Sequence, residues 1–190
     1  MFELLFAQIQ EKVPLSEKDK EDLAFFFKYK NLRKRQFLLH EGEICKQLAF
    51  VTKGALKSYT IDEKGNEHIS LLGWEGWWIS DFRSFIYSEE AILSIDAIED
   101  TELLLITRED YEAMMFKVPV MERYFRILYQ NSLATKDRRL ISSNTYTAEE
   151  KYRQLIESYP QILQRIPQHL IASYMGLTPE TFSRVKKKFL

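Results

Sequence analysis

The chain has 190 residues, of which 45% are hydrophobic and 29% are charged, and its formal net charge is −1 at pH 7. This length corresponds to one or two domains, and the composition is typical of a soluble globular protein with a substantial core. A membrane-spanning protein is not expected, because no apolar run approaches the roughly 18 residues that a spanning helix requires. The N-terminal residues carry no basic region and no cleavage motif, so we expect no signal peptide.

Cys45 is the only cysteine, which rules out an intramolecular disulfide and favours a cytoplasmic location. The small net charge hides an asymmetry along the chain. From Val120 to Leu190, twelve Lys and Arg residues stand against six Asp and Glu residues, whereas residues 1–119 carry fifteen against twenty-two. This pattern suggests that the C-terminal part meets a polyanion, although surface charge can also drift along a chain without any function.

Apolar residues at helical spacing predict helical structure from Phe2 to Lys30. Pro14 interrupts this stretch, and Ser16 followed by Asp19 marks the start of a second helix.

Short runs rich in β-branched and aromatic residues follow from Leu32 to Ile106, and five of the six glycines fall among them. Ser58–Ile61 and His68–Leu72 predict a β-hairpin around a glycine-bearing loop. Ile92–Ile98 and Leu103–Ile106 predict two later strands. Short strands with regular turn signals indicate a β-sandwich or barrel.

Helical spacing returns after this β-rich part, where Thr107 and Asp110 mark a helix start before Tyr111–Phe116. The long helix predicted over Val120–Ser142 carries a heptad seam, in which residues recur at alternating steps of four and three. The seam consists of Val120, Tyr124, Ile127, Asn131, Ala134, Arg138 and Ile141. A helix packed against its own domain shares this spacing. We expect a homodimer interface formed by Tyr124, Ile127, Asn131, Ala134 and Arg138.

A capping box formed by Thr147 and Glu150 opens another helix, which ends near Ser158 before Pro160. Residues 168–187 then match a helix-turn-helix. Ala172 is the small residue where its two helices cross.

The remaining positions of this motif fit as well. Gly176 supplies the tight turn, and Pro167 suits the first position of the first helix, where a missing N–H costs nothing. The second helix starts with Thr178 as its N-cap and Pro179 as its first residue. The apolar residues that pack the two helices together are Ile171, Met175, Leu177, Phe182 and Val185.

At about 100° per residue, the second helix separates into an apolar face and a polar face. Glu180 and Arg184 lie on the polar face, where Glu can accept from a cytosine amino group and Arg can pair twice with guanine. The residues expected to contact bases or phosphates are Gln168, Thr178, Pro179, Glu180, Thr181, Ser183, Arg184, Lys187 and Lys188. The alternative, a basic amphipathic helix with a solvated face, is disfavoured by the joint match to the motif.

A β-rich segment, a long helix and a terminal helix-turn-helix, in this order, resemble the family of the cyclic AMP receptor protein and the fumarate-nitrate regulator. The resemblance spans nearly the whole chain. Gly176–Arg184 looks like that family's recognition-helix signature, and Leu38–Glu43 and Lys53–Lys57 look like turns of its β-roll. It implies an α+β fold with an N-terminal double-stranded β-helix of the cyclic-nucleotide-binding type.

The resemblance also implies that Glu180 and Arg184 read bases. Many members carry an Arg just before the Glu, where this chain has Pro179, so the target sequence is expected to differ from the best-known site. The family's wing strands normally follow the helix-turn-helix. Because the sequence stops at Leu190, we expect an incomplete wing.

The effector pocket departs from the cyclic-nucleotide-binding members, in which a Gly-Glu pair and a later Arg hold the ligand. Ser80 and Asp81 replace the pair, residues 84–106 contain no Arg, and Arg83 comes too early. A buried phosphate needs a cation or N–H donors, so we expect a sensor that does not bind cyclic AMP. The residues of this degenerate pocket are Trp77, Trp78, Ser80, Asp81 and Arg83. The Trp rings either fill the cavity or line it for an apolar ligand.

We therefore expect a β-roll sensor with flanking helices at residues 1–118, a dimerisation helix at residues 119–142 and a DNA-binding domain at residues 143–190. The expected function is that of a homodimeric, sequence-specific transcriptional regulator. Its expected partners are double-stranded DNA and RNA polymerase, and an unidentified small-molecule effector is left open. The alternatives are a cyclic-nucleotide-responsive regulator of the same family and an interaction module that does not bind DNA.

No cofactor is expected, because one cysteine cannot hold an iron–sulfur cluster, which needs about four ligands. Haem would depend on His40 or His68, and lone histidines in β-domains more often have structural roles. The sequence contains no nucleophile–base set, no P-loop and no cluster with metal-ligand spacing. Neither an enzyme nor a metal site is therefore expected.

Overall fold

The structure is a computed structural model that describes residues 1–189. The chain divides into two compact units. The first unit holds residues 1–60 and 71–129, and the second unit holds residues 61–70 together with the chain from Gln130 onward. Among the described helices, none is long and apolar enough to cross a membrane.

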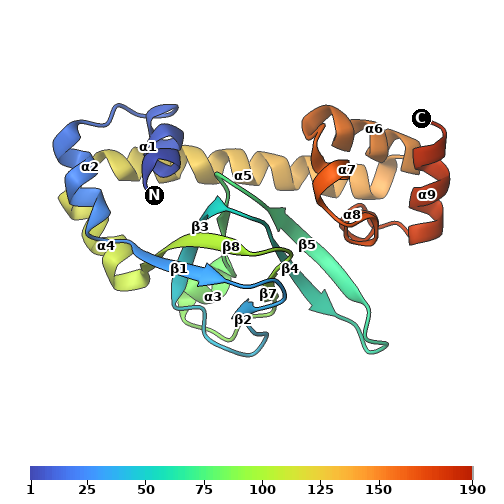
Figure 1. Ribbon diagram of the computed structural model, residues 1–190, viewed down its shortest axis with the longest axis horizontal. Coiled ribbons are helices and arrows are strands. Elements are labelled where there is room, and N and C mark those ends of the chain that lie inside the picture. The colour runs from blue at the N-terminus through green and yellow to red at the C-terminus, as the bar shows by residue number, and fades with distance from the viewer. Residues whose placement is uncertain (190) are drawn as a thin grey trace. The chain divides into compact units, whose positions relative to one another are not determined.

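Two four-stranded sheets form the strand layers of the protein, in the orders β1-β8-β3-β6 and β2-β7-β4-β5 (Figure 1). The register pairs are antiparallel in β1·β8, β3·β8, β3·β6, β2·β7 and β4·β7. The strands are β1 (Lys28–Leu32), β2 (Phe37–Leu39), β3 (Gln47–Lys53), β4 (Leu56–Ile61), β5 (Glu67–Gly73), β6 (Trp78–Ile79), β7 (Ser94–Ala97) and β8 (Thr101–Thr107).

The neighbouring strands β3 and β8 carry the centre of the core. Four consecutive residues are buried in each of them, at Leu48–Val51 and at Leu103–Ile106. Such runs fit strands that are covered on both faces. The turn between β3 and β4 requires Gly54, whose φ is +93° and whose added Cβ would lie 2.5 Å from Oγ1 of Thr101. The hairpin and the two later strands predicted from the sequence are confirmed.

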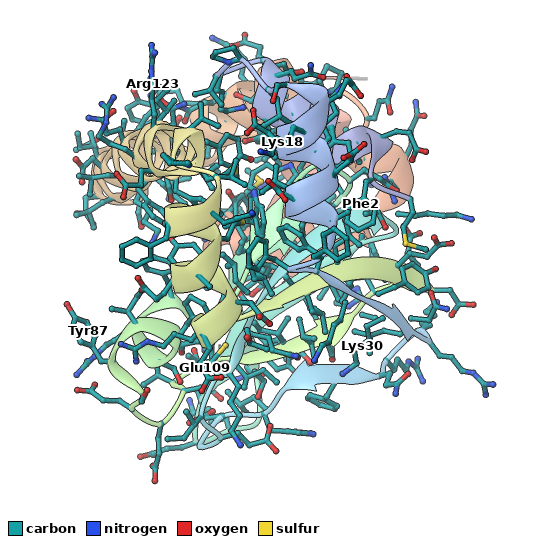
Figure 2. The ribbon with its side chains drawn as sticks, turned by 90° about the vertical axis from the view of Figure 1, so that its left-hand side faces the viewer. Phe2, Lys18, Lys30, Tyr87, Glu109 and Arg123 are labelled. Atoms are coloured by element: carbon teal, nitrogen blue, oxygen red, sulfur yellow. The ribbon has the colours of Figure 1, made fainter. Side chains whose placement is uncertain are left out.

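Helices cover the sheets of the first unit. They are α1 (Glu3–Gln10), α2 (Glu17–Ala24), α3 (Phe82–Tyr87), α4 (Arg108–Lys117) and the first part of α5 (Val120–Thr145). Ser16 and Thr107 are the N-caps of α2 and α4, as predicted. The inward faces of α1, α4 and α5 contribute Leu5, Met114 and Met121 to the core. In contrast, Arg123 on α5 and Tyr87 at the end of α3 project outward in Figure 2.

The helical prediction for Phe2 to Lys30 is wrong at its C-terminal end. Residues Lys28–Lys30 begin strand β1, because they pair with Leu103–Leu105 of β8, more than 70 residues later in the chain. Helix α3 was not predicted from the sequence. It begins where the Asp81 side chain accepts a hydrogen bond from the backbone N–H of Ser84.

The second unit contains the C-terminal part of α5, the hairpin segment Ile61–Ser70 and four further helices among the described residues. These helices are α6 (Ala148–Ser158), α7 (Ile162–Arg165), α8 (Gln168–Tyr174) and α9 (Pro179–Lys187). The predicted capping box of Thr147 and Glu150 opens α6. Tyr152 and Leu155 on the inner face of α6 form the core of this unit with Ile171 and Phe182.

Candidate nucleic-acid interface

Helices α8 and α9 form the predicted helix-turn-helix. Gly176 lies between them with a φ of +67°, a conformation that an L side chain rarely adopts. The turn is closed by hydrogen bonds from the backbone N–H of Gly176 to the carbonyl of Ser173 and from that of Leu177 to the carbonyl of Ala172, both 2.9 Å long. Ala172 is fully buried, as expected for the crossing point of the two helices. Pro167 occupies the N-cap position of α8, one residue earlier than predicted.

The apolar side of α9 fixes its orientation. Phe182 and Val185 are buried, and the ring of Phe182 contacts Tyr152 of α6 edge-on, with 5.7 Å between the ring centroids. The polar side therefore faces outward. The exposed members of the predicted DNA-contacting set on this helix are Pro179, Glu180, Ser183, Arg184 and Lys187, and Gln168 at the start of α8 is also exposed.

Three of the predicted DNA-contacting residues take part in internal contacts. The side chain of Thr178 caps α9, where it accepts from the backbone N–H of Thr181 and donates to the half-buried hydroxyl of that residue. Lys188 forms an ion pair of 2.6 Å with Glu149 of α6. The hydrogen bond from Lys188 is the main cause that lowers the pKa of Glu149, and the charge of Arg184 adds to it. The ion pair between Lys188 and Glu149 joins α6 to the C-terminal end of α9.

The predicted effector residues Ser80 and Asp81 have structural roles. Asp81 is only 3% exposed, and its carboxylate accepts hydrogen bonds from the backbone N–H groups of Ser84 and Ile92, at 3.1 and 2.9 Å. These are the kind of donors that an anionic ligand would require, and the protein's own carboxylate occupies them. The hydroxyl of Ser80 lies 3.2 Å from the sulfur of Cys45.

The other residues of the predicted pocket also make contacts within the protein. Arg83 is 68% exposed at its side chain and pairs with Glu89 at 2.7 Å. Trp77 stacks at a tilt on Trp74. Trp78 packs between Phe50 and Phe125, with ring centroids at 5.1 and 5.2 Å, and its Nε1 donates to the hydroxyl of Tyr124 at 3.0 Å. Trp78 thus fills space against the core, and the Arg83 guanidinium is paired at the surface.

Only some residues of the predicted seam on α5 are exposed. Tyr124 is 1% exposed inside the first unit, so its side chain packs into its own core and does not face a partner. Ile127 is half-buried, while Asn131, Ala134 and Arg138 are exposed. The sequence did not identify Leu133 and Leu140, which are 62% and 64% exposed and, with the 58% exposed Ile141, form an apolar stripe beside Ala134. A long polar helix with leucines at a seven-residue interval was the available signal.

Other polar contacts were not visible in the sequence. In the first unit, the ammonium group of Lys57 lies 3.7 Å from the carboxylate of Asp96, and both side chains are almost completely buried. In the second unit, Ser173 and Arg139 bond to the backbone of β5. Neither set has a local motif, because each joins residues far apart in the chain.

Comparison with known proteins agrees with this architecture. Residues 29–117 match the model of the cyclic nucleotide-binding domain family. The chain is 23% identical over 173 residues to the regulatory protein HlyX of Actinobacillus pleuropneumoniae, a match that covers 84% of this chain and 70% of that protein. It is 27% identical over 156 residues to the cyclic AMP receptor protein of Thermus thermophilus, which covers 78% of this chain and 70% of that protein.

A similar solved structure is that of FixK2 from Bradyrhizobium japonicum. It has a TM-score of 0.72 and 20% sequence identity, and the match covers 86% of this chain and 84% of that one. The relatives named above are regulators or receptor proteins, not enzymes. Together with the sheets, the long helix and the helix-turn-helix, these matches show that the chain is similar in sequence to these regulatory proteins and shares the fold of FixK2.

Proposed function

We propose that this protein is a homodimeric, sequence-specific DNA-binding transcriptional regulator whose sensor does not bind cyclic AMP. The outward face of α9 carries this proposal. Glu180 and Arg184 are exposed one helical turn apart, on a helix whose opposite side is buried. This arrangement presents an acceptor and a bidentate donor to base edges in a major groove.

The basic residues around this face supply the second component of DNA binding. Lys187 at the end of α9 is exposed. Contacts of lysine side chains to DNA phosphates position a protein on the duplex without reading the base sequence. Two copies of the helix-turn-helix would bind half-sites about 34 Å apart, or a multiple of that distance, on a nearly palindromic site. The apolar stripe of Leu133, Leu140 and Ile141 on α5, together with the neighbouring Ala134, is the proposed contact between the copies.

The proposed domain organisation is the one expected from the sequence. It consists of a sensor at residues 1–118, a dimerisation helix at residues 119–142 and a DNA-binding domain at residues 143–190. We propose a cytoplasmic regulator that acts with RNA polymerase, and the effector of its sensor is unidentified. The match to the cyclic nucleotide-binding domain family favours the alternative, a regulator that responds to a cyclic nucleotide. The placement of Asp81 and Arg83 opposes that alternative, since it offers a buried carboxylate and a solvent-exposed cation.

The decisive experiment compares two variants on DNA selected from a random pool. Arg184→Ala should weaken binding to the preferred site by about 1–3 kcal/mol and relax the preference at one base pair. Lys187→Ala is the matched control, because loss of a phosphate contact weakens specific and random DNA alike and lowers the salt dependence by about one unit. Equal weakening of specific and random DNA by Arg184→Ala would show that Arg184 does not read a base.

A further inference from the structure

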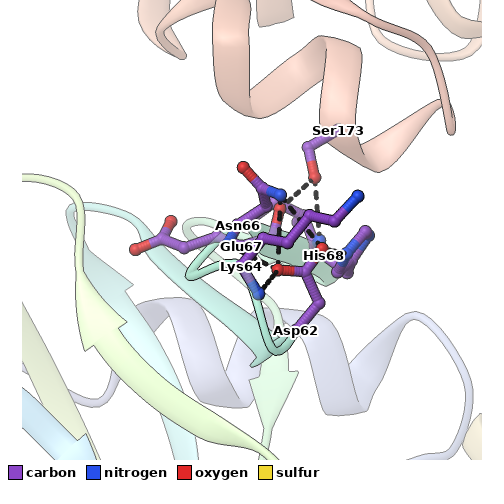
Figure 3. Close-up of polar contacts among 7 residues, drawn as sticks. Asp62, Lys64, Asn66, Glu67, His68 and Ser173 are labelled. Carbon is purple, nitrogen blue, oxygen red and sulfur yellow. Dashed lines mark hydrogen bonds and ion pairs between the residues drawn. The ribbon is translucent and has the colours of Figure 1, made fainter.

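The two helices of the helix-turn-helix are held in the second unit by different contacts. Helix α8 is anchored by Ser173, whose hydroxyl donates to the carbonyl of Glu67 at 2.7 Å and accepts from the backbone N–H of Ile69 at 3.0 Å (Figure 3). Helix α9 packs on α6, where the ring of Phe182 contacts Tyr152. The C-terminal end of α9 adds a polar contact to this packing.

This polar contact is the ion pair of Lys188 with Glu149. Lys188 is the C-cap of α9, and its ammonium group lies 2.6 Å from Oε1 of Glu149, in the first turn of α6. Both side chains reach the surface, with exposed fractions of 59% for Lys188 and 38% for Glu149. The hydrogen bond from Lys188 is the main cause that lowers the pKa of Glu149. Lys188 is therefore bound to a carboxylate before any DNA phosphate arrives.

Glu149 also lies within electrostatic reach of Arg184, the proposed base-reading residue. Arg184 stands one helical turn before Lys188 on α9, and its charge likewise lowers the pKa of Glu149. A carboxylate beside Arg184 lies near the phosphates that flank a base contacted by that side chain, and like charges repel. The DNA-binding face thus carries an acidic group together with its own counter-ion.

We propose that Glu149 is a specificity-determining residue, which holds Lys188 away from DNA phosphates and so suppresses binding to DNA of arbitrary sequence. Non-specific binding is driven by phosphate contacts, so each cation that pairs within the protein weakens it. Specific binding also draws on base contacts, which do not depend on that cation. The proposal rests on the DNA-binding function proposed above.

The sign of the effect follows from two consequences of Glu149→Gln. The first is that Lys188 becomes free for a phosphate contact and a repulsive charge is lost. A non-specific complex gains this contact in full, because the protein settles where it meets the most phosphates, whereas base contacts fix the register at the selected site. The second is that the C-terminal end of α9 is released from α6, which loosens the helix that carries Glu180 and Arg184 and weakens base contacts only. Both consequences lower the ratio of specific to non-specific affinity.

The test measures the affinity of the full-length protein for random DNA and for the selected site between about 50 and 200 mM salt. For random DNA, Glu149→Gln should steepen the dependence of log affinity on log salt by about one unit and make binding at the low-salt end about threefold tighter. The ratio of specific to non-specific affinity should fall by about threefold. Glu157→Gln is the matched control, because it removes the same charge from an exposed residue near the other end of α6 and should change neither quantity.

A second measurement needs no DNA. In Lys188→Gln, the pKa of the Glu149 carboxyl, followed by nuclear magnetic resonance, should rise toward its ordinary value, because its main hydrogen-bond donor is lost. An unchanged pKa would refute the ion pair. A raised pKa with an unchanged salt dependence in Glu149→Gln would refute the competition with phosphates.

Two further outcomes would also decide the matter. An equal effect of Glu157→Gln would show that net charge alone is responsible, and an unchanged or higher affinity ratio in Glu149→Gln would refute the role in specificity. If the unaltered protein prefers no DNA site at all, the proposed function fails. The pKa of Glu149 and the salt dependence on random DNA would still decide whether Glu149 holds Lys188 away from phosphates.

Discussion

The apolar stripe on α5 permits a quantitative test of the proposed dimer. The change is Leu140→Ala. The side chain of Leu140 is 64% exposed in the single chain, so it contributes little to the fold of one protomer. Its removal should therefore leave the monomer folded and weaken the association of two copies.

The expected size follows from the surface removed. Leu→Ala deletes three carbon atoms, each worth about 0.8 kcal/mol when its surface is buried. Scaled by an exposed fraction of 64%, this gives roughly 1.5 kcal/mol for each side chain that the partner covers. A two-fold interface contains the residue twice, so the total is about 3 kcal/mol, or roughly a 100-fold rise in the dissociation constant of the dimer.

Sedimentation equilibrium measures this constant directly. Ile92→Ala is the control, because Ile92 is 59% exposed on the first unit and does not belong to α5. It removes a comparable exposed apolar side chain and should leave the dimer unchanged. A dissociation constant for Leu140→Ala within about threefold of the unaltered protein would place the interface elsewhere, since each factor of ten corresponds to about 1.4 kcal/mol.

Two further predictions concern the first unit. Burial raises the pKa of Tyr124 from its ordinary value of 10.0 to about 12, although the hydrogen bond from Trp78 acts in the opposite direction. As the pH rises, the unfolded chain therefore loses this proton before the folded protein does. The free energy of unfolding should therefore fall by up to about 3 kcal/mol as the pH rises from about 10 to about 12. When urea unfolding is measured across this range, Tyr124→Phe should lack this dependence on pH. The same dependence in both proteins would contradict the assignment. Titration calorimetry with cyclic AMP or cyclic GMP should detect no micromolar binding, because Asp81 already occupies the N–H groups of Ser84 and Ile92. Micromolar binding together with tighter DNA binding would restore the cyclic-nucleotide alternative.

The parts of the fold that depend on local chemistry were predictable from the sequence. The Gly176 turn and the Thr178 N-cap each involve residues within a few positions of one another, and both are present as predicted. Strand β1 was misassigned because its partner β8 lies more than 70 residues away and overrides local helical spacing. Tertiary pairing of this kind leaves no local pattern.

The long helix shows a different limit of the sequence. A spacing of four and three identifies a face that is buried somewhere, but it does not distinguish the helix's own core from a partner. Tyr124 lies in the predicted seam and packs into the first unit, whereas Leu133 and Leu140 lie outside the seam and are exposed. Side chains are buried in the first half of α5 and exposed in the second half because different elements pack against each half. This difference is a property of the tertiary structure.

The contacts of Ser173 also affect how the chain folds during synthesis. Ser173 bonds to Ile69 and Glu67, which precede it by 104 and 106 residues. The hairpin therefore leaves the ribosome long before the helix that covers its edge, and closing so long a loop slows the final docking step. Until then the β5 edge is exposed to pairing with other chains. A fragment that begins at Gln130 lacks the hairpin altogether, so the helix-turn-helix of such a fragment would fold without the backbone that Ser173 binds.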